Sequence, residues 1–165
     1  MKIFGITGWS GSGKTTLIEQ IVPRLVKKGL VVSLIKHAHH SFDVDHPGKD
    51  SYRHRQAGCT EVLVSSRNRW VIMHELRDAP EPTLEDQVKR ISPCDLLLIE
   101  GYKRYPMPKL EVWRSENGKP FLHPEDANIV ALATDVPQRS GPPKRFDLND
   151  HEGISDFVLE FNGLR

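Results

Sequence analysis

A phosphate-binding loop is predicted near the N-terminus, where residues 8–15 have the sequence GWSGSGKT. Glycines allow a backbone to curl so that successive N–H groups point toward one phosphate, and the helix that follows presents its positive end to the same anion. We expect Lys14 to reach the β- and γ-phosphate oxygens, the Thr15 hydroxyl to bind Mg²⁺ and Thr16 to approach the α-phosphate. The expected nucleotide contacts in this segment are Gly8, Gly11, Ser12, Gly13, Lys14, Thr15 and Thr16.

An acidic residue at the end of a buried strand is the expected partner of this loop. Residues 95–99 read DLLLI, and Glu100 follows at the carboxyl end of that strand. A phosphate loop needs a carboxylate that holds the metal ion or its water shell. Asp95 would lie about 15 Å from this end of the strand, because an extended chain advances about 3.3 Å per residue. Glu100 is therefore the predicted metal-site acid, with a solvated strand end as the alternative.

A polar segment with four histidines, residues 36–50, follows the second expected strand. Long loops in compact domains are usually functional. In one interpretation Asp43 or Asp45 binds Mg²⁺ through water, while Lys36 or Lys49 contacts phosphate. In another, imidazoles and carboxylates hold a transition metal, although the histidine spacing fits no defined zinc motif. An ordinary solvated loop is the third interpretation.

The elements that must position these residues alternate between strands and helices, which predicts one α/β domain over residues 1–165. We expect the three-layer α/β/α arrangement of P-loop NTPases, a mostly parallel sheet and added β-hairpins near 60–76 and 105–122. The apolar strand at 30–35 should be covered on both faces. Pro23 should kink the first helix or make an irregular turn. Strands are expected at 2–7, 30–35, 60–65, 70–76, 95–99, 110–114 and 129–133, and helices at 14–28, 51–57, from Thr83 and at 150–161.

Composition and cysteine spacing argue against several classes of partner and of metal site. Lys and Arg total 23 against 22 Asp and Glu, so the balanced charge gives no reason to expect nucleic-acid or membrane binding. Cys59 and Cys94 are far apart in sequence, which argues against a cysteine metal site. The apolar start is too short for a signal peptide, and no run approaches the roughly 20 apolar residues of a membrane helix. A cytoplasmic protein is expected.

With these segments placed, the chain resembles the molybdopterin-guanine dinucleotide biosynthesis protein B (MobB) family almost from end to end. The resemblance rests on residues 8–16, on LIKHAHH at 34–40 and on DVDHPGKDSY at 43–52. The last of these is far more specific than the phosphate loop, which many unrelated families share. The match continues in Arg69-Trp70, in the segment 95–103 with its EGYK, and at 131–137 and 150–158.

The resemblance implies a homodimeric GTP-binding protein with weak, Mg²⁺-dependent GTP hydrolysis. It implies an accessory factor for attaching GMP to molybdopterin, working beside the MobA-like nucleotidyltransferase and other enzymes of molybdenum cofactor biosynthesis. The family's acidic strand end falls on Glu100 and its loop acids on Asp43 and Asp45. Lys14, Glu100 and Asp45 are accordingly the expected catalytic residues, and Thr15, Glu100, Asp43 and Asp45 the expected metal ligands.

The residue that reads the base is less clearly marked. An Asn-Lys-x-Asp box, which reads guanine in many GTPases, is absent from the sequence. Asp135, at the end of a strand in ATDVP, could accept the N1 and N2 protons of guanine. A turn- or helix-capping role for Asp135 is an equal alternative.

Catalysis of hydrolysis should be slow. Phosphoryl transfer depends on positioning and charge neutralisation, and the sequence offers neither an evident water-positioning glutamine nor a cis arginine finger. Arg53, Arg55 or Arg69 could act across a dimer, with surface solvation as the alternative for each. Two other functions fit the same loop: a small-molecule kinase with an arginine-rich lid drawn from 104–145, and a non-catalytic adaptor gated by GTP.

Overall fold

A computed structural model of the chain describes residues 1–38, 42–136 and 141–164. These residues form two compact units, the first made of 1–37 and 88–165 and the second of 38–87. The second unit is thus inserted into the chain of the first. Among the described residues, no helix has the length and apolar character needed to cross a membrane.

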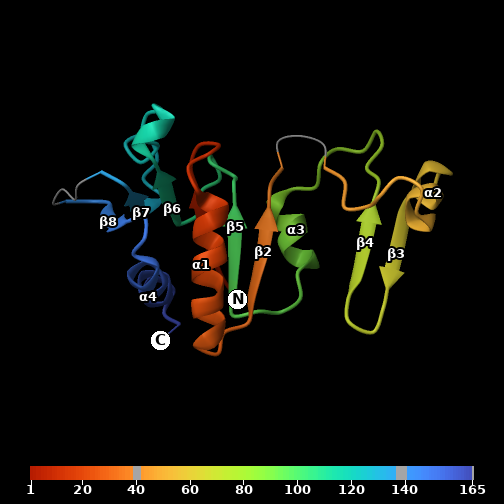
Figure 1. Cartoon of the computed structure of the whole chain (residues 1–165), viewed down its shortest axis with the longest axis horizontal. Helices are drawn as coiled ribbons and strands as arrows, with labels where there is room; N and C mark the ends of the chain where they lie inside the picture. The colour runs from red at the N-terminus through yellow and green to blue at the C-terminus, as the bar shows by residue number, and fades with distance from the viewer. Residues whose placement is uncertain (39–41, 137–140, 165) are drawn as a thin grey trace. The chain divides into compact units, whose positions relative to one another are not determined.

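A parallel sheet of six strands is the centre of the first unit (Figure 1). Every neighbouring pair in it is parallel, so the carboxyl ends of the strands lie along one edge. The strand order is β2-β5-β1-β6-β7-β8, which places β1 between β5 and β6. This confirms the predicted α/β class. The strands are β1 (Lys2–Thr7), β2 (Val32–Lys36), β5 (Leu96–Glu100), β6 (Lys109–Trp113), β7 (Ile129–Thr134) and β8 (Lys144–Asp147).

Two helices, α1 (Lys14–Lys27) and α4 (His151–Asn162), pack against each other and share one apolar core with the sheet. Burying the apolar side chains of these helices and strands removes apolar surface from water, which is the main stabilising contribution to such a core. The core therefore fixes the start of α1 beside the carboxyl end of β1. Its fully buried members include Phe4, Ile6, Ile21, Leu25, Leu110, Val112, Ile154 and Val158.

Pro23 does not interrupt α1, contrary to the irregular turn that the sequence predicted. A proline has no N–H, so the carbonyl of Glu19 loses its helical donor. Both residues are exposed, so water can satisfy that carbonyl and the helix continues.

The second strand differs from its prediction. β2 is an edge strand whose described partner is β5, and Leu34 is 42% exposed. The prediction that both faces are covered is therefore wrong. An apolar run of this length cannot by itself distinguish an edge from a central strand.

The second unit contains α2 (Asp50–Gln56) and an antiparallel hairpin of β3 (Glu61–Ser65) and β4 (Trp70–His74). This confirms the first of the two predicted hairpins. Helix α3 (Leu84–Arg90) begins in this unit and ends in the first. The Thr83 hydroxyl accepts the N–H of Asp86 and caps its start.

The second predicted hairpin, near 105–122, is wrong. Strand β6 from this segment pairs in parallel with β1 and β7, and a short 3-10 turn, η1 (Ser115–Asn117), follows it. The segment after β6 therefore lies at the carboxyl edge of the sheet, where the phosphate loop also lies.

Candidate phosphate-binding site

The loop after β1 has the backbone conformation that the phosphate-loop prediction requires. Gly8 has φ 144° and Gly13 has φ 96°, values that side-chain-bearing residues rarely adopt. A Cβ at Gly8 would lie 2.3 Å from the carbonyl oxygen of Val112 in β6. Gly13 is the N-cap of α1 and contributes no capping side chain, and the first turn of α1 contains no acidic residue. The positive end of α1 is therefore not neutralised by its own side chains.

Lys14 turns back over the loop. Its ammonium donates to the carbonyl oxygens of Gly8, at 3.1 Å, and Trp9, at 2.8 Å. Burial lowers the pKa of Lys14; Glu100 opposes this shift, and Lys103 and Lys36 reinforce it. Four charged groups thus act on one another at the loop, three of them cationic, which suits a multiply charged anion.

Thr15 and Glu100, predicted to share the metal, are brought together. The Thr15 hydroxyl lies 3.3 Å from Glu100 Oε1, and the Lys36 ammonium lies 3.4 Å from Glu100 Oε2. The register of the sheet produces this arrangement, because Glu100 is opposite both Ile6 of β1 and Lys36 of β2. Asp95 lies at the other end of β5, as expected, where its carboxylate accepts the N–H of Val31.

The residues present fit Mg²⁺ and a phosphate group. A hydroxyl and a carboxylate are the hard oxygen ligands that Mg²⁺ prefers. Two more hydroxyls at the loop, those of Thr7 and Ser12, are buried without a hydrogen-bond partner among the described residues. A buried hydroxyl without a partner costs free energy, so these groups favour a polar ligand at the loop.

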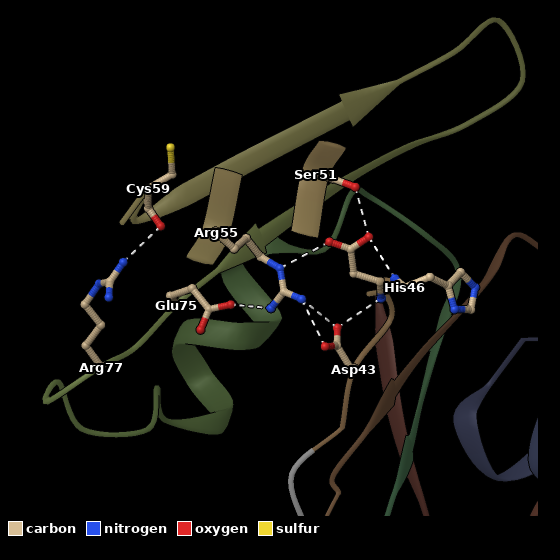
Figure 2. A network of polar contacts seen from close by, with 8 residues as sticks. Asp43, His46, Ser51, Arg55, Cys59, Glu75 and Arg77 are labelled. Atoms are coloured by element: carbon tan, nitrogen blue, oxygen red, sulfur yellow. Dashed lines mark hydrogen bonds and ion pairs between the residues drawn. The ribbon is translucent and has the colours of Figure 1, made fainter. Parts of the chain in front are cut away.

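The loop acids Asp43 and Asp45 belong to a polar network inside the second unit. Figure 2 shows this network, with Asp43 and Arg55 labelled. Arg55 of α2 lies at its centre and binds Asp43 at 2.9 Å, Asp45 at 3.3 Å and Glu75 after β4. Asp45 also accepts the Ser51 hydroxyl at 2.9 Å, and its side chain is only 7% exposed. Both predicted acids therefore have a structural role, which ties the loop to α2 and the hairpin. Their predicted role as ligands of Mg²⁺ or its water stays a prediction.

Charge stabilises this network in its ionised form. The N–H of Asp45 and the Arg55 guanidinium lower the pKa of Asp43. Burial alone would raise the pKa of Asp45, but hydrogen bonds from Ser51, His46 and Arg55 lower it. The carboxylates in turn raise the pKa of Arg55. The Arg55 side chain is 11% exposed, so the surface-solvation alternative is wrong for this arginine.

The transition-metal interpretation finds no support in the described part of the chain. No cluster of three or more His, Cys, Asp or Glu side chains suited to a metal ion occurs there. His39 and His40 lie outside the described residues. The His37 ring packs at 4.8 Å from the Tyr102 ring, which places it beside the strand end that carries Glu100.

Asp135 follows β7 and caps the turn after β6. Its carboxylate accepts both the N–H and the hydroxyl of Ser115, each at 2.9 Å. Burial alone would raise its pKa, but these bonds and the nearby Arg114 lower it. The capping alternative thus describes its present contacts, while guanine reading stays a prediction.

Three residues at the loop were not singled out from sequence. The Arg114 guanidinium donates to the carbonyl oxygen of Ser12 at 3.2 Å, and the Asn117 amide donates to that of Ser10 at 3.3 Å. The Lys103 ammonium lies 4.2 Å from the centre of the Trp9 ring. Lys103 lies in the EGYK segment, which is part of the family resemblance and could have drawn attention to it. Arg114 lies in no motif, and Asn117-Gly118 indicated only a hairpin turn; the pairing of β6 with β1 brings both residues to the loop.

Comparisons with known proteins agree with this architecture. The family model of molybdopterin guanine dinucleotide synthesis protein B matches residues 3–135. The molybdopterin-guanine dinucleotide biosynthesis adapter protein of Escherichia coli (strain K12) is 40% identical over 162 residues, covering 96% of this chain and 92% of that protein. A crystal structure of molybdopterin-guanine biosynthesis protein B superposes with a TM-score of 0.75 and 25% identity, over 96% of this chain and 99% of that one. A uridine kinase of Leuconostoc citreum is 31% identical over 109 residues, covering 60% of this chain and 51% of that kinase.

Proposed function

Because the chain belongs to the molybdopterin guanine dinucleotide synthesis protein B family, we propose that it binds GTP and hydrolyses it slowly as an accessory factor in attaching GMP to molybdopterin. The observation that carries the nucleotide part is the meeting of Lys14, Thr15 and Glu100 at the start of α1. The pathway part is supported by the names of the relatives, which are adapters of molybdopterin-guanine dinucleotide biosynthesis.

The chain's own residues divide the work. The backbone N–H groups at the start of α1 and the Lys14 ammonium would bind the phosphates. Thr15 and Glu100 would hold Mg²⁺, which when bound neutralises charge on the phosphate oxygens. Lys36 would keep the Glu100 carboxylate directed toward Thr15, since it contacts the other carboxylate oxygen. Turnover is slow in this proposal, because no described side chain at the loop is evidently placed to orient an attacking water.

Glu100→Gln is expected to lower Mg²⁺-dependent GTP hydrolysis at least about tenfold, with a much smaller effect on GTP affinity without Mg²⁺. The amide keeps the shape and one acceptor but removes the negative charge that attracts a divalent cation. Calorimetric titration of GTP with and without Mg²⁺, together with phosphate release at limiting Mg²⁺, measures the two effects separately.

Asp95→Asn is the matched control, since Asp95 lies at the opposite end of the same strand. It should leave Mg²⁺ dependence unchanged. Equal hydrolysis by the wild type and Glu100→Gln at limiting Mg²⁺ would assign the metal to another group. A wild-type protein that binds no guanine nucleotide would remove the proposal altogether.

Two further functions are separated by simple measurements. The kinase alternative draws on the partial match to uridine kinase, and it requires fast ATP turnover when a phosphate acceptor is present. The proposed function requires preference for GTP and slow turnover without an acceptor. A GTP-gated adaptor would bind a MobA-like nucleotidyltransferase equally well with GTP and with a non-hydrolysable analogue. Loss of that binding with the analogue would instead make hydrolysis part of the cycle.

We also propose that the chain forms a homodimer, which the hairpin of the second unit supports. Strands β3 and β4 expose apolar side chains on both faces: Leu63 at 59%, Trp70 at 66% and Ile72 at 47% on one, and Val64 at 43% and Val71 at 42% on the other. An isolated two-stranded hairpin is marginally stable in water, and its edges are unpaired. Exposed apolar surface of this kind is typical of protein–protein interfaces.

Leu63→Glu combined with Ile72→Lys is expected to convert a dimer into a monomer. The two residues are opposite each other in the hairpin, so the pair exchanges an apolar patch for an opposite-charge pair that leaves the strands themselves paired. Light scattering after size exclusion gives the mass directly. Val26→Glu, at an exposed apolar residue of α1, is the control and should leave the mass unchanged. A double variant with wild-type mass would place the interface elsewhere.

A further inference from the structure

Residues 114–120, here called the loop brace, are tied to the phosphate loop at three points. The guanidinium of Arg114 donates to the carbonyl of Ser12, and the amide of Asn117 donates to that of Ser10. The indole N–H of Trp9 donates to the carbonyl of Pro120 at 2.7 Å. Two of the three contacts use carbonyls of the loop, whereas a phosphate is bound by N–H groups. The brace therefore does not compete for the groups that bind the anion.

The same brace also determines where Asp135 lies. Ser115, the residue after Arg114, donates both its N–H and its hydroxyl to the Asp135 carboxylate. Strands β1, β6 and β7 are consecutive neighbours in the parallel sheet, so the loop, the brace and Asp135 follow adjacent strand ends. One short segment thus connects the predicted phosphate site with the predicted base-reading carboxylate.

The brace is itself held in one conformation. Its 3-10 turn ends at Gly118, whose φ of 58° lies in the left-handed region. The Trp113 indole donates to the carbonyl of Lys119 at 2.8 Å, and the Trp113 ring stacks on that of Phe121 with centroids 4.3 Å apart. The brace therefore continues directly from Trp113 at the end of β6, and its C-terminal flank is anchored back to the same residue.

We propose that the loop brace lines the nucleotide site beside the phosphate loop and has two separable roles. Arg114 and Asn117 are positioning residues that hold the phosphate loop in its binding conformation. Ser115 positions the Asp135 carboxylate to accept the N1–H and the 2-amino protons of a guanine base. This inference rests on the proposed GTP binding. It identifies residues 114–120 as the segment that couples phosphate binding to base selection.

The experiment compares three ligands that divide the nucleotide. GTP carries the phosphates and the 2-amino group, ITP lacks only the 2-amino group, and inorganic tripolyphosphate lacks the base. Their affinities for the full chain are measured by calorimetry, with tripolyphosphate also measured by its displacement of bound GTP. Arg114→Gln should weaken all three ligands by a similar factor of about ten, or about 1.4 kcal/mol, which corresponds to one charge-assisted hydrogen bond. The ratio of GTP to ITP affinity should stay unchanged.

Ser115→Ala should do the opposite. Tripolyphosphate affinity should stay at the wild-type value, while the preference for GTP over ITP falls about fivefold as Asp135 loses its hydroxyl donor. Lys27→Ala is the control, because Lys27 lies outside the brace at the exposed end of α1. It should change neither quantity. At Ser115 a merely structural loss would lower the affinities for all three ligands, without a split between phosphate and base. At Arg114 it would lower the melting temperature together with the affinities, whereas the positioning role leaves the melting temperature near its wild-type value.

Each outcome decides the inference. Wild-type affinities for all three ligands in folded Arg114→Gln would overturn the positioning role, and an unchanged GTP preference in Ser115→Ala would overturn the base-reading role. If Arg114→Gln does not fold, Asn117→Ala tests the same positioning role at the exposed turn, with the same pattern expected. A wild-type protein that binds tripolyphosphate but shows no preference for GTP over ITP would overturn the coupling of phosphate binding to base selection. It would leave the phosphate site in place. A wild-type protein that binds none of the three overturns the proposed function itself.

Discussion

Lys14→Ala is expected to bind GTP at least about 100-fold more weakly than the wild type, with little change in melting temperature. Hydrogen bonds to charged groups contribute about 1.5–3 kcal/mol each, and an ammonium that spans two phosphates makes two of them. In the structure the Lys14 ammonium contacts only carbonyls of its own loop, those of Gly8 and Trp9, among the hydrogen bonds described for it. Its removal therefore breaks no distant contact of the fold.

Lys27→Ala is the control for Lys14→Ala, since it removes the same charge from the exposed end of the same helix. Calorimetric titration with GTP and Mg²⁺ and a thermal melt of each variant form the measurement. Near-normal GTP affinity in folded Lys14→Ala would remove the phosphate-loop assignment, and the proposed function with it.

Gly8→Ala is expected to abolish GTP binding and to lower the free energy of unfolding by about 2–4 kcal/mol, the combined cost of overpacking and of a strained backbone. A Cβ at this position would lie 2.3 Å from the Val112 carbonyl and 2.7 Å from the Ser12 hydroxyl. The φ of 144° adds strain of its own. Neither the carbonyl in β6 nor the loop can move without losing contacts of the sheet.

Gly29→Ala separates the two causes of the expected loss of stability, close packing of the Cβ and backbone strain. Gly29 also has a positive φ, of 90°, but a Cβ there meets nothing within 4 Å. That variant should lose only about 1 kcal/mol and keep its full GTP affinity. Chemical denaturation of both variants gives the two free energies. Equal losses at Gly8 and Gly29 would show that close packing against β6 does not shape the loop.

The positions of Lys14, Thr15 and Glu100 could be predicted from sequence, because they depend on a local turn and on one strand register; their roles toward nucleotide and metal stay predictions. A glycine-rich turn between a strand and a helix determines its own conformation. Glu100 follows from the rule that parallel strands end at one edge, and β5 pairs directly with β1. The predictions for Lys14, Thr15 and Glu100 needed nothing beyond these facts, and the structure brings all three together.

The contacts of Asp43 and Asp45 and several elements of the fold depend on long-range contacts that no local sequence pattern encodes. Asp43 and Asp45 have the residue types of metal ligands, but spacing cannot reveal that Arg55 binds both. Strand β8 was missed because its four residues, KRFD, contain three charged side chains and a single buried phenylalanine and follow a proline-rich connector. The segment after β6 looked like a hairpin because of its Asn117-Gly118 turn, yet β6 pairs only with parallel neighbours. The prediction of a single domain over residues 1–165 stays a prediction.

The position of β1 in the sheet has a consequence for the order in which the chain can fold as it is made. Strand β1 leaves the ribosome before the other described strands, but both its neighbours, β5 and β6, are encoded some 90 to 110 residues later. Until then β1 has no hydrogen-bonded partner in the sheet, and β2, the next strand to emerge, pairs with β5 and not with β1. The inserted second unit is complete in sequence before either neighbour appears. A nascent chain therefore completes the surroundings of the candidate phosphate site only after both β5 and β6 have been made.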